Sequence, residues 1–410
     1  MQNDIDRQVW AKMMGIINAW CLIPLVMSFQ TNIRLLFSLS MTAYGLTFLA
    51  EYVLSRRYTQ FTFSKRHYWY IAMIALWLMF PIYHIFEKTG EFYHHEMEKH
   101  LAFLLFGVMG FMGAHKRVSL RTAAISCIAM AVIANILVLI AAPWTEIIDS
   151  EQPLMVLHET RVRLFSEHMR YNLCENMALL ACFYIYDMET RKSRKWIICA
   201  AIALIVICMF TSPGRAGVVT MLILLSIRLI AVLWHKSKIS AVALPILVIT
   251  CGAALMISTQ KWQEFNRLTH RAIHEEPRIM VWKAASSVIR QHPLGLGASD
   301  GLTAYHEAAY QYKPLHYDNI YLSHTHNVWL QYSLYFGIPG FILISMIFFI
   351  PPAIVEKKRK RLIIITLIPL FIEALVDVFG NAMPPAMFLL TLWLIVETKT
   401  EDKITKQIVK

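Results

Sequence analysis

The stretch HKRVSLRTAAISCIAMAVIANILVLIAA, residues 115–142, contains the pattern that decides the fold. A basic cluster, His115-Lys116-Arg117, stands directly before an apolar run that is long enough to cross a bilayer as a single helix. Similar apolar runs recur along the chain, and most of them are separated by short polar connections. We therefore expect an all-α integral membrane protein.

The apolar runs predict about twelve transmembrane helices. Only one polar segment is long, and it extends from Lys261 to Thr325, between the ninth and tenth spans. No repeat or separate soluble domain is evident, so residues 1–410 are expected to form a single polytopic membrane domain. The predicted spans are residues 10–29, 33–54, 68–86, 100–114, 118–142, 172–188, 196–211, 216–234, 239–259, 326–350, 361–379 and 383–397.

The composition excludes several other classes of protein. Hydrophobic residues make up 57% of the chain and charged residues 16%, whereas soluble domains carry about 25% charged residues. The net charge of +12 comes from short basic clusters between apolar runs, so we do not expect nucleic-acid binding. The seven cysteines lie in or beside apolar runs without a Cys-x-x-Cys pair, which argues against a disulfide framework or a thiolate zinc site. No cleavable signal peptide is expected either.

The basic clusters also predict the orientation of the chain. They occupy every second connection, and lysine and arginine in short connections mark the cytoplasmic side. Both termini are then cytoplasmic, and the segment from Lys261 to Thr325 lies outside the membrane. The clusters are Arg56-Arg57 with Lys65-Arg66, His115-Lys116-Arg117, Arg191 to Lys195, His235 to Lys238, and Lys357 to Arg361.

The long outer segment divides further by its pattern. Lys261 to Ala272 has apolar residues at helical spacing and predicts an amphipathic helix on the membrane surface. A second helix is expected from Pro277 to about Gln291, because acidic residues and proline favour a helix start. A glycine-rich loop follows, and Leu302 to Tyr312 can form another short helix.

Two arginines are predicted at outer helix starts, where free backbone N–H groups favour anions. Arg215 follows the helix-breaking Ser212-Pro213-Gly214, and Arg278 follows Pro277. A guanidinium there suits phosphate oxygens, so the pair could bind a pyrophosphate without a metal. The alternatives are a snorkelling side chain for Arg215 and a surface ion pair with an acidic neighbour for Arg278.

His326 lies where the outer segment enters a span, and a neutral imidazole can take a proton from a hydroxyl. Asn327 could orient that ring or a substrate, while the alternative is an interfacial histidine satisfied by the backbone. His324 forms a His-x-His pair with His326 and is a further candidate for a substrate contact. No carboxylate or cysteine with ligand spacing accompanies the pair, so no metal site is expected.

The outer loop before the sixth span contains Arg161 and Arg163, which could contact an anionic substrate or lipid headgroups. A carboxylate near the outer end of a later span, Asp377 or Glu373, could balance one of the arginines of this loop. The sequence does not choose between the two carboxylates.

Four motifs together resemble the O-antigen ligase and polymerase superfamily of bacterial surface-polysaccharide enzymes. The similarity in topology covers nearly the whole chain. The motifs are Thr211 to Arg215; Pro277-Arg278 with Trp282 and His292 to Gly297; His326-Asn327 followed by Leu330 and Gly337 to Gly340; and, more weakly, Arg163 with Asn172.

This resemblance implies an inverting, metal-independent glycosyltransferase in the bacterial inner membrane that works at the periplasmic face. The donor would be a glycan on undecaprenyl pyrophosphate, and for a ligase the acceptor would be lipid A–core. Arg215 and Arg278 would match pyrophosphate-binding arginines, and His326 the residue that activates the acceptor hydroxyl. No cofactor is implied. The last outer loop, Gly380 to Pro384, lacks an arginine that some relatives carry.

Other functions remain open from the sequence. A polysaccharide polymerase or an oligosaccharyltransferase of the same superfamily would share the donor and differ in the acceptor. A transporter or flippase would also suit twelve spans, but ionisable residues here gather at the outer surface and no internal repeat is evident. We expect the ligase because the chain is compact and its outer segment is moderate in size.

Overall fold

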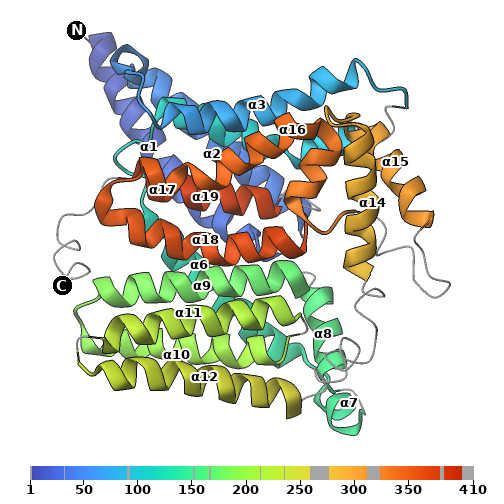
Figure 1. The fold of residues 1–410 in the computed structure, drawn as a ribbon. Helices are drawn as coiled ribbons and strands as arrows, with labels where there is room; N and C mark the ends of the chain where they lie inside the picture. The colour runs from blue at the N-terminus through green and yellow to red at the C-terminus, as the bar shows by residue number, and fades with distance from the viewer. Residues whose placement is uncertain are drawn as a thin grey trace. The chain divides into compact units, whose positions relative to one another are not determined.

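The computed structural model describes residues 2–31, 33–89, 93–150, 153–165, 168–212, 214–234, 236–258, 277–311, 324–378 and 383–398 (Figure 1). All regular secondary structure in these ranges is helical. The predicted all-α fold is therefore confirmed. The predicted amphipathic helix from Lys261 to Ala272 lies outside the described residues.

Each range predicted as a span contains a helix. By length and composition, five helices among the described residues could cross a membrane: α1 (from Asp4), α6, α10, α11 and α16. The full set of twelve spans and the orientation of the termini stay predictions. The helices in the predicted spans are α1 (Gln2–Ser28), α2 (Arg34–Leu54), α3 (His67–His84), α5 (Leu101–Met112), α6 (Leu120–Ala141), α9 (His168–Met188), α10 (Lys192–Phe210), α11 (Arg215–Leu233), α12 (Lys238–Ser258), α16 (Val328–Phe349), α18 (Lys360–Val376) and α19 (Met383–Glu397).

Shorter helices occupy the connections. The helix predicted from Pro277 has the expected bounds, whereas the helix predicted from Leu302 begins one turn earlier, at Ala298. These connecting helices are α4 (Tyr93–Lys99), α7 (Trp144–Asp149), α8 (Pro153–Leu164), α14 (Pro277–Gln291), α15 (Ala298–Gln311) and α17 (Pro351–Ile354), with 3-10 turns at Arg57–Gln60 and Lys357–Arg359.

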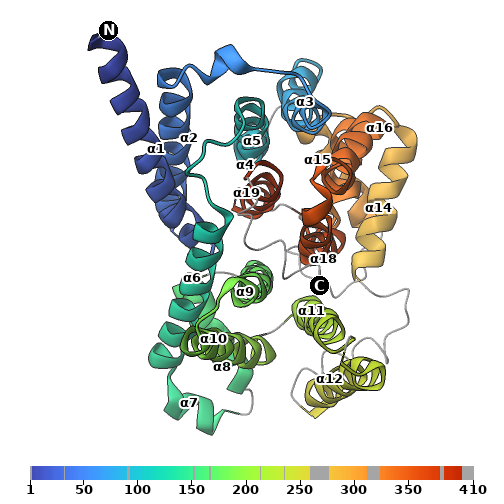
Figure 2. The same cartoon turned by 90° about the vertical axis from the view of Figure 1, so that its left-hand side faces the viewer.

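The chain divides into two compact units. Unit 1 contains residues 1–21, 41–119 and 271–399, and unit 2 contains residues 22–40, 120–270 and 400–410. In unit 1, α3 packs against α5 and α16, while α14 and α15 pack against each other and against α16 (Figure 1). In unit 2, α9 packs against α6, α10 and α11, and α11 packs against α12 (Figure 2).

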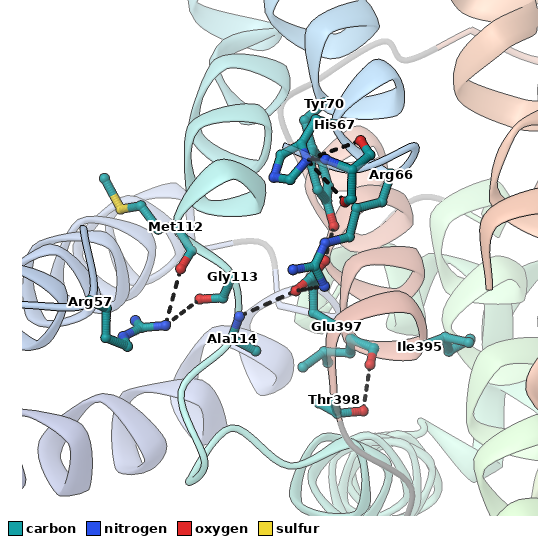
Figure 3. A network of polar contacts seen from close by, with 12 residues as sticks. Arg57, Arg66, His67, Tyr70, Met112, Gly113, Ala114, Ile395, Glu397 and Thr398 are labelled. Carbon is teal, nitrogen blue, oxygen red and sulfur yellow. Dashed lines mark hydrogen bonds and ion pairs between the residues drawn. The ribbon is translucent and has the colours of Figure 1, made fainter. Parts of the chain in front are cut away.

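A buried carboxylate ties three helices of unit 1 together (Figure 3). Glu397, the last residue of α19, accepts hydrogen bonds from the hydroxyl of Tyr70, from Arg66 Nη1 at 3.2 Å and from the backbone N–H of Ala114 at 3.4 Å. Tyr70 belongs to α3, and Ala114 follows α5. A buried charge with this many donors is well compensated, so the network holds the ends of α3, α5 and α19 in place.

Unit 2 has a comparable buried network around Glu175 of α9. Its carboxylate accepts hydrogen bonds from Gln30 Nε2 at 2.5 Å and from Asn135 Nδ2 at 3.0 Å. The hydroxyl of Tyr171 donates to Asn135 Oδ1. Since Asn135 belongs to α6, these bonds fix α9 against α6 and satisfy polar groups that the interior would otherwise disfavour.

Candidate active site

The helix that follows the His-Asn motif is broken at Gly337, where φ is 61° and ψ is −146°. The loop from His292 to Gly297 fits into this break. The N–H of Ile338 donates to Pro293 O at 2.9 Å, and the N–H of Gly297 donates to Tyr335 O at 2.8 Å. A Cβ atom at Gly337 would overlap the backbone of Pro293, Leu294 and Gly295. Two glycine-containing motifs that lie apart in the sequence thus interlock backbone to backbone.

Reciprocal contacts fix the start of α15 beside this loop. The carboxylate of Glu87 accepts the N–H of Ser299 at 2.8 Å. In return, Asp300 accepts the N–H groups of Lys88 and Thr89 at 2.9 and 3.1 Å. Although partial burial opposes it, these N–H donors lower the pKa of Asp300, which stabilises its charged form. The contacts anchor the start of α15 to the segment that follows α3.

Asn327 is the N-cap of α16. Its Oδ1 accepts the N–H of Leu330 at 3.0 Å, and its Nδ2 approaches Leu375 O of α18 at 3.4 Å. An N-cap asparagine satisfies a backbone donor that the helix leaves unpaired. The side chain therefore has a structural role that the sequence analysis did not assign, and its predicted contact with substrate stays a prediction.

His324 and His326 lie together against a carboxylate from another helix. Asp377 Oδ1 is 3.5 Å from Nε2 of His324 and 3.7 Å from Nδ1 of His326. The two imidazole centroids are 4.3 Å apart. Asp377 can reach them because α18 ends at Val376 and the next residue is extended. His326, the predicted proton acceptor, thus has the carboxylate of Asp377 beside its ring.

Among the described residues, Asp377 has these two histidines and no arginine within ion-pair distance, so its expected pairing with an arginine stays a prediction. The two imidazoles lie within 4 Å of the carboxylate oxygen and favour its charged form. A carboxylate beside an imidazole orients the ring and stabilises the imidazolium that forms when a proton is taken up.

Arg278 is connected to the same cluster through charge. It lies in the first turn of α14, where the sequence predicted a helix start. Its guanidinium interacts electrostatically with Glu373 of α18, and Glu373 in turn interacts with Asp377. The structure thus brings Arg278, His324 and His326, which were predicted independently as site residues, into one region of unit 1.

The histidine pair and Asp377 also have the donor set of a cation site. One ligand atom from each of the three residues lies within 4.8 Å of the others, and in the part of the chain that the structure describes they form the only such group. Three protein ligands is the number found in many catalytic zinc sites. No carboxylate accompanies the histidine pair in the sequence, but the fold brings Asp377 beside it. The effect of a chelator on activity distinguishes a proton-transfer site from a metal site, because only a metal site would lose its function when the metal is removed.

His326 has a left-handed backbone conformation with φ at 49°. Such a conformation is uncommon for residues other than glycine, and it often marks a functional site where the surroundings hold the strain. Here the bonds of Thr325 and Asn327 on either side hold it: Thr325 donates to Asn327 O at 2.9 Å, and Gln331 Oε1 accepts the N–H of Thr325 at 3.1 Å.

Arg215 is the first residue of α11 in unit 2, as predicted. Gly214 precedes it with φ at 100°, and a Cβ there would overlap Asn172 and crowd His168. Asn172 Nδ2 lies 3.5 Å from Gly214 O. The weaker Asn172 motif therefore supports the turn that presents Arg215, which is half-buried at a helix N-terminus where anions are favoured.

The two arginines of α8 differ in their surroundings. Arg161 is 1% exposed and donates to the carbonyl groups of Thr211 and Cys208 at the end of α10, at 2.6 and 3.3 Å. Its guanidinium also lies over the ring of Tyr171. This burial favours a structural role over the predicted substrate contact. Arg163 is exposed on the same helix, and its substrate contact stays a prediction.

These features define a helical, membrane-type protein with an imidazole–carboxylate site and arginines at helix starts. A family model described as O-antigen ligase matches residues 198–345, a range that includes Arg215, Arg278 and the His326-Asn327 motif. Residues 198–345 are thus similar to the O-antigen ligase family, which supports the superfamily that the motifs predicted. The family implies glycosyltransferase or ligase activity in general. A search of curated proteins gives no match.

Proposed function

We propose that the protein is an O-antigen ligase. It transfers a glycan from undecaprenyl pyrophosphate to lipid A–core at the periplasmic face of the bacterial inner membrane. The family match and the apolar helices support the class, and the arrangement of His326 and Asp377 carries the chemical argument. In this proposal the chain crosses the membrane about twelve times, with both termini in the cytoplasm and residues 261–325 in the periplasm.

In the proposed reaction His326 takes the proton from the acceptor hydroxyl, and Asp377 positions the ring and stabilises the imidazolium. The acceptor oxygen forms a bond to the anomeric carbon while the bond from that carbon to the pyrophosphate oxygen breaks. Attack opposite the leaving group inverts the anomeric centre. Because pyrophosphate is a good leaving group, positioning and charge neutralisation can provide most of the remaining catalysis.

Arg215 and Arg278 bind the pyrophosphate in this proposal. Each is half-buried and lies at the start of a helix, where backbone N–H groups add to the attraction for an anion. Neutralisation by guanidinium groups makes a divalent cation unnecessary, so transfer should be independent of metal. Arg163 and His324 are proposed as further substrate contacts.

The test is glycan transfer by the purified protein in detergent containing EDTA, with an undecaprenyl-pyrophosphate glycan and purified lipid A–core. Glycosylated lipid A–core that disappears in the Arg278→Ala variant supports a metal-independent ligase. Chain growth from the donor alone, without transfer to lipid A–core, indicates a polymerase. Neither product indicates a transporter, and loss of transfer in EDTA with recovery on adding zinc assigns a metal to the histidine pair and Asp377.

A further inference from the structure

Helix α14 has two chemically distinct faces. One face is apolar and buried against α15 and α16 (Figure 1), and it consists of Met280, Val281, Ala284, Ala285 and Val288. The other face lines an open pocket of about 340 Å³, which is at the lower end of the range for small-molecule sites. Its residues recur at helical spacing, so they form one stripe: Ile279, Trp282, Lys283, Ser286, Ser287 and Arg290.

The stripe combines an aromatic ring with cations and hydroxyl groups. Trp282 is half-buried, and its indole Nε1 has no hydrogen-bond partner among the described residues, although an indole N–H normally finds one when buried. Lys283 and Arg290 are exposed, and within the described ranges neither forms an ion pair. The described residues that line the pocket include no carboxylate. Among the described residues, the stripe therefore has unused donors and positive charge without an ion-pair partner.

These groups match the chemistry of an anionic saccharide. An indole offers a flat apolar surface to the C–H face of a sugar ring, while its N–H and the serine hydroxyl groups can bond to sugar hydroxyl groups. Lysine and arginine bind phosphate or carboxylate substituents through charge-assisted hydrogen bonds. A neutral glycan would leave the two cations without partners.

The stripe also has a defined direction relative to the proposed active site. Arg278 lies at the start of α14, and Arg290 lies twelve residues later, so the two are about 18 Å apart along the helix axis. Trp282 is one turn from Arg278, on the same side of the helix. A saccharide along the stripe would thus have one end near Arg278 and extend away from it over several sugar units.

We propose that this stripe is the binding site for the anionic oligosaccharide of the acceptor, and that it holds the acceptor with its reactive end toward Arg278 and His326. The inference rests on the proposed ligase function. The acceptor is assigned as the occupant because Arg278 already binds the pyrophosphate of the donor in the proposed function, whereas Lys283 and Arg290 are further cations along the stripe.

Binding tests the inference without turnover. The probe is the soluble phosphorylated oligosaccharide released from lipid A–core, titrated into the full-length protein in detergent. We expect the Lys283→Gln/Arg290→Gln double variant to bind about tenfold more weakly, since two charge-assisted contacts are removed. The dephosphorylated oligosaccharide should bind the unaltered protein as weakly as the phosphorylated form binds the variant.

Two controls make the result specific. Lys88→Gln removes an exposed cation from another predicted outer connection, and it should leave the affinity unchanged. Trp282→Leu should also weaken binding, including that of the dephosphorylated oligosaccharide, because it removes the stacking surface. Equal affinity of the double variant and the unaltered protein overturns the inference. So does displacement of the oligosaccharide by phosphatidylglycerol, which would identify a lipid-headgroup site.

Kinetics separate this inference from the proposed function. In the transfer assay the double variant should raise KM for lipid A–core about tenfold, with kcat and the KM for the donor within twofold of the unaltered protein. A rise in the donor KM instead overturns the acceptor assignment. If the unaltered protein transfers no glycan at all, the ligase proposal fails, while the binding experiment still decides whether the stripe recognises an anionic saccharide.

Discussion

Glu397 and Asp377 are both largely buried carboxylates of unit 1, and their surroundings differ. The side chain of Glu397 is 2% exposed and accepts hydrogen bonds from a tyrosine, an arginine and a backbone N–H (Figure 3). Asp377 is 21% exposed, and its side chain faces two imidazoles at 3.5 and 3.7 Å. The first carboxylate is fixed by strong donors, whereas the second is accessible and lies beside groups that can exchange protons. Glu397 therefore stabilises the fold, whereas Asp377 is placed to take part in proton transfer.

The backbone shows the same contrast. Glu397 ends a regular helix, but His326 lies in the left-handed region, a conformation that costs about 1–3 kcal/mol. The neighbouring hydrogen bonds of Thr325 and Asn327 hold that conformation in place. The left-handed backbone thus lies at the histidine of the proposed site, whereas Glu397 itself lies in regular helix, and this agrees with a functional role for His326.

The largest expected effect is on turnover in the His326→Asn variant. Asparagine tolerates the left-handed conformation, so the fold should be retained while the proton acceptor is lost. Turnover at saturating substrates should fall by about 10²–10⁴-fold, the usual contribution of a general base. Thermal unfolding in detergent, measured alongside, should show a midpoint close to that of the unaltered protein.

The two carboxylates can be compared directly by the same change from acid to amide. Asp377→Asn should lower turnover by about 10²-fold, because the ring loses its orienting group and the imidazolium its counter-charge. Glu397→Gln should leave the turnover of the folded protein unchanged. It should instead lower thermal stability by about 1–2 kcal/mol, since the donors around Glu397 lose a charged acceptor. Equal losses of turnover in the two variants would contradict a chemical role for Asp377 and a structural role for Glu397.

A smaller effect is expected from glycine substitutions at two positive-φ positions. Gly337→Ala should destabilise the protein by about 2 kcal/mol or more, because its Cβ would overlap the loop from Pro293 to Gly295. Gly113→Ala is the matched control: its φ is 66°, but the nearest atom to an added Cβ is a side-chain oxygen at 3.5 Å. Thermal unfolding is measured for both variants. Both carry the backbone strain of an alanine at positive φ, so a larger loss of stability in Gly337→Ala reports the overlap with the loop.

Much of the fold could be predicted because the apolar runs and their limits are local properties of the sequence. Pro277 and Ser212-Pro213-Gly214 correctly predicted the starts of α14 and α11, and hence the positions of Arg278 and Arg215. The capping role of Asn327 could also have been predicted, since an asparagine before an apolar run is a common N-cap.

Other parts of the site depend on tertiary structure and could not be predicted. Asp377 meets His324 and His326 only because α18 packs against α16, and the sequence offered Glu373 as an equal alternative. The burial of Arg161 depends on the end of α10. The fit between Gly337 and the loop from Pro293 to Gly295 joins two motifs whose glycines indicate close approach without indicating a partner.

The most direct test of the proton-acceptor role is chemical rescue of the His326→Gly variant, because glycine accepts the backbone conformation and leaves space for a free imidazole. The rate of glycan transfer to lipid A–core is measured at saturating substrates in EDTA, with and without added imidazole. Our account predicts almost no transfer by the variant alone and a rise in rate with imidazole concentration. Transfer by the variant at the rate of the unaltered protein, without imidazole, would contradict it.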